Sequence, residues 1–239
     1  MQHDRSHNPA TMTPLDHLSM SLPRPHYVGW PFVALGILLS LLGLKLGQWL
    51  IWAGVGLAGF CWFFFRNPPR VTIPRDDLVV APADGLVSEI RQASPPPELE
   101  LGDRACWRVS IFLSVLDVHA NRVPCCGKVT RIEYRHGSFM NAGLDKASVE
   151  NERNSVTIRV ADGRHVVFVQ IAGLIARRIL CFLREGQEVS IGDIGGFIRF
   201  GSRTDIYLPH GVTPQVVVGQ IVTGGETIVA SLSVDAARV

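Results

Sequence analysis

The chain has 239 residues and a formal net charge of +2, with its Lys and Arg residues scattered along the sequence. Nucleic-acid binding requires a clustered basic face, so this charge pattern gives no support for it. The five cysteines form no Cys-x-x-Cys pair, and half of the eight histidines lie within residues 1–26. This arrangement has no metal-ligand spacing, and we predict no metal site.

Residues 1–26 are polar and show neither helical nor strand periodicity, which predicts a disordered tail without a secretory signal. Residues 27–66 are strongly apolar. Val28–Leu44 is nearly uninterrupted, Lys45 follows it, and Leu46–Phe65 carries no charge. A spanning helix needs about 20 apolar residues. The second stretch meets this length and the first is marginal, so the segment predicts a hydrophobic helical hairpin in a membrane.

Basic residues flank the predicted hairpin on both outer sides, with Arg24 before it and Arg66 and Arg70 after it. By the positive-inside tendency, both ends face the cytoplasm. A shallow re-entrant hairpin fits the same pattern as a double span. The apolar core hairpin of a soluble protein is a further alternative.

Residues 67–239 have the composition of a β-rich domain. Branched and aromatic residues occur in strand-length runs bounded by Gly, Pro or Asp. The predicted strands are Val71–Val80, Trp107–Leu113, Lys128–Tyr134, Ser155–Val160 and His165–Ile171. Ala161–Gly163 predicts a hairpin turn between the last two. Ala172–Arg184 is the one plausible helix, although a strand over part of it fits as well.

Short Gly-turn-strand units recur along this domain at Asp84–Val87, Glu185–Val189, Val218–Val222 and Gly225–Ile228. They resemble the units of lipoyl- and biotinyl-type half-barrels, but no Met-Lys-Met stands at a turn tip. The predicted fold is therefore mainly β (α+β), with lipoyl-like half-barrel units that carry no lipoate or biotin. The hydrophobic helical hairpin precedes this domain.

The most informative motif is Gly201-Ser202 within Arg199–Pro209. Taken alone, a Gly-Ser pair is an ordinary turn. Three further blocks accompany it in a fixed order, namely Ala81–Gly85, Phe112–Pro124 and Asn141–Asn154. Together they resemble the phosphatidylserine decarboxylases, specifically their short bacterial branch. Four ordered blocks are far more specific than one dipeptide.

The resemblance implies that the bond between Gly201 and Ser202 breaks itself by serinolysis. It also implies that Ser202 becomes a covalent pyruvoyl group, the cofactor of the enzyme. The precursor would then consist of a β chain, 1–201, and an α chain, 202–239, which remain associated. Glycine suits position 201, because it has no Cβ and tolerates strained backbone conformations.

The family's relay carries over to Asp84, His119 and Ser202. His119 would be the base that activates Ser202, and Asp84 would hold the histidine tautomer. Many family members have a second histidine three residues further on, where this chain has Arg122. Whether His119 serves cleavage, decarboxylation or both therefore stays open.

The implied activity is decarboxylation of phosphatidylserine to phosphatidylethanolamine through a Schiff base to the pyruvoyl group. The implied setting is the bacterial inner membrane, with phosphatidylserine in the bilayer and the catalytic domain in the cytoplasm. The resemblance requires no metal and leaves a homo-oligomer open. A membrane-anchored serine hydrolase is one alternative, but Gly-x-Ser-x-Gly is absent. A non-catalytic half-barrel binding module is another, and it leaves Gly201-Ser202 unexplained.

Overall fold

The computed structural model describes residues 23–137, 151–173, 178–198 and 202–233. The chain divides after Pro69 into two compact units, and each is described by itself. Residues 1–22 of the predicted tail lie outside the described residues.

The first unit is an apolar helical hairpin. A short 3₁₀ turn, Tyr27–Gly29, leads into α2 (Trp30–Leu46), and α3 (Gln48–Phe64) follows after the single residue Gly47. Gly47 has φ 139°, a backbone conformation that favours glycine. The prediction that the second apolar stretch is long enough to span a membrane and the first is marginal is wrong. Among the described residues, Tyr27–Leu46 is the stretch long and apolar enough to cross a membrane, whereas α3 has 17 residues. The sequence hid this because Lys45 falls within α2 instead of ending it.

Small residues let α2 and α3 pack closely. A Cβ added to Gly54 would lie 2.5 Å from the carbonyl oxygen of Gly36 and would overlap the hydroxyl of Ser40. The Ser40 hydroxyl donates across the hairpin to the carbonyl oxygen of Ile51, 3.1 Å away. Close backbone approach and hydrogen bonding by a small polar residue are typical of helices packed in an apolar environment.

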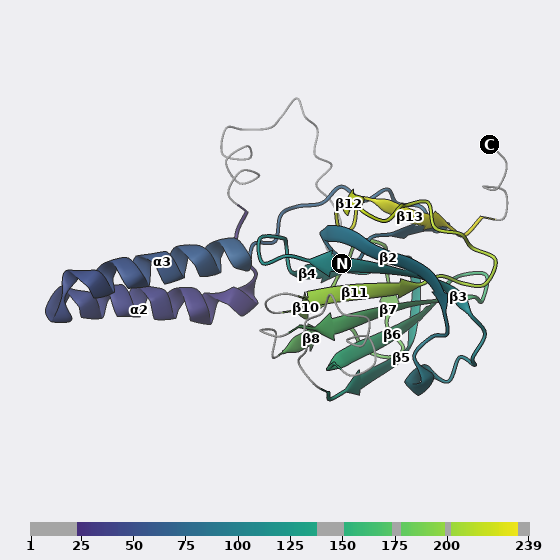
Figure 1. Cartoon of the computed structure of the whole chain (residues 1–239), viewed down its shortest axis with the longest axis horizontal. Helices are drawn as coiled ribbons and strands as arrows, with labels where there is room; N and C mark the ends of the chain where they lie inside the picture. The colour runs from purple at the N-terminus through teal and green to yellow at the C-terminus, as the bar shows by residue number, and fades with distance from the viewer. Residues whose placement is uncertain (1–22, 138–150, 174–177, 199–201, 234–239) are drawn as a thin grey trace, which may run out of the picture. The chain divides into compact units, whose positions relative to one another are not determined.

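The second unit is built on a curled eight-stranded antiparallel sheet in the order β12-β2-β3-β11-β7-β6-β5-β9 (Figure 1). Its strands are β2 (Gly85–Ala93), β3 (Cys106–Leu113), β5 (Gly127–Arg135), β6 (Arg153–Arg159), β7 (His165–Ala172), β9 (Glu188–Val189), β11 (Ser202–Tyr207) and β12 (Ile221–Val222). The 3₁₀ turn Pro97–Leu99 lies between β2 and β3. The predicted mainly β fold with half-barrel character is confirmed.

Two smaller sheets complete this unit. One has three strands in the order β4 (Ala120–Arg122), β10 (Ile194–Ile198) and β8 (Ile179–Cys181). The other pairs β1 (Leu78–Val80) with β13 (Ile228–Ser231). The main hydrophobic core contains inward-facing residues of β3, β6, β7 and β11.

Strand β11 lies between β3 and β7 and separates two kinds of side chain. Successive side chains of a strand point to opposite faces. Ser202, Thr204 and Ile206 share the inner face, where Ile206 enters the main core. Arg203 and Asp205 lie on the outer face and pair there, with Nε–Oδ1 at 2.7 Å and Nη2–Oδ2 at 2.9 Å. Both faces of this strand are therefore buried.

Most of the predicted strands appear with shifted ends, and the turn at Ala161–Gly163 is present, closed by the Gly163 N–H donating to the Val160 carbonyl. The predicted helix over Ala172–Arg184 is wrong in its described part, where Ile179–Cys181 forms β8. Residues 174–177 of that stretch lie outside the described residues. A short apolar run does not distinguish a buried strand from a buried helix by periodicity alone.

Substituting Gly54 with alanine should destabilise the hairpin, because the new methyl group would overlap the Gly36 carbonyl. Overpacking costs about 1–3 kcal/mol. Gly56→Ala is the matched control, since a Cβ at Gly56 meets nothing within 4 Å. Both substitutions gain about 1 kcal/mol of helix propensity. Thermal unfolding in detergent, followed by circular dichroism, should show a lower Tm for Gly54→Ala only. Equal Tm values for the two variants would contradict the close packing.

Candidate functional site

The site begins with Ser202, the first residue of β11. Its Cα partners are Leu113 of β3 and Ala172 of β7, so it lies in the middle of the eight-stranded sheet. The residue is completely buried, and its Oγ has no hydrogen-bond partner in the described part of the chain. A buried hydroxyl without a partner costs roughly 1–3 kcal/mol. Such a cost is typical of a group retained for chemistry rather than for stability.

The second residue is His119, which is also completely buried. It follows the turn Ser114–Asp117, in which the Ser114 N–H donates to Asp117 Oδ2 at 2.7 Å. The Nδ1 atom of His119 lies 2.9 Å from the carbonyl oxygen of Asp117. A carbonyl oxygen only accepts hydrogen bonds, so Nδ1 carries the proton. In the neutral ring, Nε2 then keeps the lone pair that a general base requires.

The structure brings His119 to the Ser202 end of β11. The carbonyl oxygen of His119 accepts from the N–H of Ile198, at 3.3 Å. Ile198 in turn packs against Ala172, the cross-strand partner of Ser202. The two residues thus lie on either side of one small apolar contact, although 83 positions separate them in the sequence.

Asp84 lies between β1 and β2 and makes a different set of contacts. Its Oδ2 accepts from Arg70 Nη2 at 2.6 Å, and its Oδ1 accepts from the Gly224 N–H at 2.8 Å. Burial raises the pKa of Asp84, and the charge of Arg70 and the Gly224 hydrogen bond offset part of this increase. The tautomer of His119 is fixed by the Asp117 carbonyl, so the role of Asp84 toward His119 stays a prediction. Arg70 and Asp117 are the partners that sequence reasoning missed.

Arg122 contacts the segment that precedes Asp84. Its backbone N–H donates to the Pro82 carbonyl at 2.7 Å, and its Nη1 donates to the Gly192 carbonyl at 2.9 Å. Burial lowers the pKa of Arg122, and repulsion from Arg70 acts in the same direction, whereas Asp84 raises it. Arg122 therefore belongs to the charge cluster around Asp84. It does not replace a second histidine chemically, because a guanidinium cannot act as a base at neutral pH.

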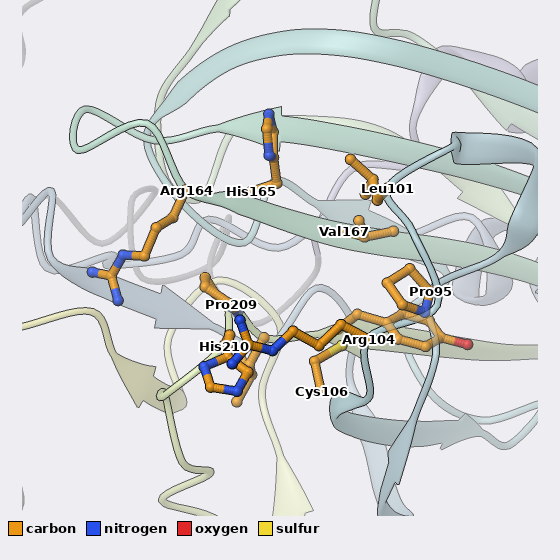
Figure 2. Close-up of a pocket in the computed structure, with 11 residues that line it drawn as sticks. Pro95, Leu101, Arg104, Cys106, Arg164, His165, Val167, Pro209 and His210 are labelled. Atoms are coloured by element: carbon orange, nitrogen blue, oxygen red, sulfur yellow. The ribbon is translucent and has the colours of Figure 1, made fainter.

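A surface pocket of about 230 Å³ lies at the other end of β11 (Figure 2). Tyr207, the last residue of β11, contributes to its wall together with Arg104, Arg164 and His210. Ser202 and Tyr207 are five positions apart, which corresponds to about 17 Å at the rise of a β-strand. Arg164 points away from the other labelled side chains in Figure 2 and is paired with Asp162, 2.8 Å away. This pocket is therefore separate from the Ser202 site.

Gly201, the other half of the predicted cleavage site, lies outside the described residues, as do Asn141–Ser148 of the fourth sequence block. The described part of the site consists of a buried serine and a buried histidine in the base tautomer. A carboxylate paired with arginine lies at the neighbouring loop.

The chain is therefore a mainly β half-barrel protein with an apolar helical hairpin before the barrel, and it carries a buried serine and a buried histidine. The sequence profile of the family described as phosphatidylserine decarboxylase matches residues 57–230. The phosphatidylserine decarboxylase proenzyme of Granulibacter bethesdensis is 55% identical over 94% of this chain and 92% of its own length. Those of Cereibacter sphaeroides and Gluconobacter oxydans are each 51% identical, over 94% and 92% of this chain and 97% and 100% of their own lengths. The chain belongs to the phosphatidylserine decarboxylase family.

Replacing Arg70 with glutamine should destabilise the protein in a pH-dependent way. Burial already raises the folded-state pKa of Asp84 above its unfolded value, and loss of Arg70 removes an opposing charge. The stabilisation from protonated Asp84 is complete below the ordinary carboxyl range, about pH 4. It is lost as the pH rises through the folded pKa. The loss caused by Arg70→Gln should therefore be larger at pH 7.5 than at pH 4.5.

A hydrogen bond to a charged group contributes about 1.5–3 kcal/mol, which corresponds to a fall in Tm of about 3–12 °C at pH 7.5 for a protein of this size. Circular dichroism of the detergent-solubilised protein measures this change. In the double variant Arg70→Gln/Asp84→Asn, the pH dependence should disappear. An equal fall in Tm at both pH values would show that Arg70 acts independently of Asp84.

Proposed function

We propose that this protein decarboxylates phosphatidylserine to phosphatidylethanolamine by means of a pyruvoyl group formed from Ser202. The observation that carries the proposal is the completely buried Ser202 Oγ, which has no hydrogen-bond partner among the described residues. A structural serine would be expected to have such a partner. A residue that is consumed in a reaction does not need one, so Ser202 fits conversion to another group. The relatives' designation as proenzymes supports the same reading.

Processing begins with attack of Ser202 Oγ on the Gly201 carbonyl carbon. The new C–O bond forms as His119 Nε2 takes the hydroxyl proton, and the C–N bond then breaks as the leaving nitrogen takes a proton. The resulting ester loses the Cα proton and the Gly201 carboxylate by elimination. The remaining dehydroalanine tautomerises to an imine, which water hydrolyses with release of ammonia. Every atom required comes from the chain and from water.

In this proposal, the residues around Ser202 activate its hydroxyl as a nucleophile. A serine hydroxyl is a weak nucleophile without a base, and base catalysis contributes typically about 10²–10⁴-fold. His119 has the tautomer that leaves Nε2 able to accept the proton. Asp84 would act through the electrostatics of the cluster with Arg70 and Arg122.

The chemistry that a pyruvoyl group at residue 202 would supply is a ketone able to condense with the substrate amine and to act as an electron sink for decarboxylation. The chain provides the surroundings in which this happens. The buried sheet interior would limit the access of bulk water, and His119 would hold or return a proton near residue 202.

The two chains of the processed protein would stay associated through β-sheet hydrogen bonds. Residues 202–233 contribute β11, β12 and β13, which pair with β3 and β7, with β2, and with β1, respectively. Three separate strand pairings and a shared core therefore hold the α chain in place.

Cleavage should be visible as two masses, corresponding to 1–201 and 202–239, with a carbonyl instead of an amine at the start of the smaller chain. Ser202→Ala and His119→Ala should each remain a single, inactive chain, because one lacks the nucleophile and the other lacks the base. Intact mass spectrometry and carbonyl-specific labelling measure both outcomes. A wild-type chain that stays whole, or a free serine at the start of the smaller chain, would refute the proposal.

The hairpin should hold the protein on the cytoplasmic face of the bacterial inner membrane, where phosphatidylserine is available. The apolar stretch Tyr27–Leu46 and the flanking Arg24, Arg66 and Arg70 support this location. The protein should sediment with membranes after a high-salt wash and require detergent for release. Recovery of the full-length protein in the salt wash would contradict the anchoring role.

A further inference from the structure

A buried chain of amides crosses the interior beside Ser202. Asn154 Nδ2 donates to Gln170 Oε1 at 2.9 Å, and Gln170 Nε2 donates to Asn121 Oδ1 at 2.8 Å. All three residues are at most 1% exposed. The chain of hydrogen bonds leads from β6 through β7 of the large sheet to β4 of the three-stranded sheet.

The direction of these hydrogen bonds leaves one amide donor, on Asn121, unused. Because Asn121 accepts from Gln170 through Oδ1, its Nδ2 amino group is available to donate. That amino group is buried and has no hydrogen-bond partner in the described part of the chain. The hydroxyl of Thr204, like that of Ser202, is buried and has no hydrogen-bond partner in the described part of the chain. Burying unpaired polar groups is unfavourable, so their concentration at one place indicates a ligand or a reaction.

The strand register places the Asn121 amino group near Ser202. Gln170 is the cross-strand partner of Thr204, and Ser202 lies two residues further along the same face of β11. Asn121 itself lies in β4, and His119 stands immediately before the first residue of that strand. Through Gln170, the Asn121 amide therefore reaches the face of β11 that carries Ser202.

Gly196 preserves this arrangement. It is the Cα partner of Asn121 in β10, and a Cβ there would lie 2.8 Å from Gln170 Nε2 and closer still to the Leu180 carbonyl. Any side chain at this position would displace Gln170 from Asn121. The absence of a side chain at residue 196 keeps the amide chain in register.

We propose that the Asn121 Nδ2–H group donates to the oxygen that becomes negatively charged when Ser202 attacks the scissile carbonyl. This inference rests on the self-cleavage described under the proposed function. As the Oγ–C bond forms and His119 takes the hydroxyl proton, the carbonyl π electrons move onto that oxygen. Asn121 stabilises the charge until the C–N bond breaks. Gln170 and Asn154 are positioning residues that hold the amide in the donating orientation.

The test is the rate of precursor cleavage of the full-length chain, followed by pulse-chase synthesis and denaturing electrophoresis. Asn121→Ala should cleave about 10²–10³-fold more slowly than wild type, the usual effect of removing one oxyanion donor. Asn121→Ser keeps a short donor and should recover part of the rate. Asn154→Ala is the matched control, because it disrupts the same amide chain at the end away from Ser202.

A second measurement separates catalysis from folding. The Tm of each variant is determined in the uncleavable Ser202→Ala background. Asn121→Ala should lose rate out of proportion to its loss of Tm, whereas Asn154→Ala, which keeps the donor and loses only a positioning residue, should lose less rate for a comparable loss of Tm. Cleavage losses that simply follow the Tm losses would assign Asn121 a structural role and overturn the inference, as would a wild-type cleavage rate in Asn121→Ala. A wild-type protein that never cleaves would instead refute the proposed function.

Discussion

The pairing of β11 with β3 on one side and β7 on the other determines where every group of the site lies. This register sets Ser202 opposite Leu113 and Ala172 and turns its side chain to the inner face. A slip of one residue would exchange the two faces of the strand. Arg203 and Asp205 would then both face the apolar core, where burying a charged pair is costly. The outer ion pair therefore disfavours the wrong register, even though it lies on the face opposite the reactive one.

The contact between the eight-stranded sheet and the three-stranded sheet adds the second constraint. Apolar packing of Ala172 with Ile179 and Ile198 fixes the distance between the two layers. The hydrogen bond from Gln170 of the large sheet to Asn121 of the small sheet then fixes their alignment. Polar groups buried at such a contact are costly unless they are aligned, and for this reason they specify one arrangement over others. The site is thus a consequence of how two sheets pack together.

The sequence predicted those features that depend on local signals. Strand-length apolar runs and Gly turns revealed the half-barrel, and the ordered blocks identified Ser202, His119 and Asp84. The partners of these residues were hidden, because they come from distant parts of the chain. Arg70 reaches Asp84 from 14 positions away, and Gln170 reaches Asn121 from 49. The sequence predicted a helix over Ala172–Arg184, with a strand over part of it as the alternative, and this stretch contains β8. A short apolar run suits both structures until its neighbour β10 is known.

The central position of β11 also affects the lifetime of the molecule. With the proposed cleavage at the start of this strand, complete unfolding would release two separate polypeptides. Their reassociation would be a bimolecular reaction, in competition with aggregation of exposed strand edges. The hydroxyl that drives processing would no longer exist, so a refolded pair could not repeat the step that produced it. The durability of the active protein would then be governed by the rate of its first unfolding rather than by an equilibrium free energy. Each molecule could therefore be processed only once.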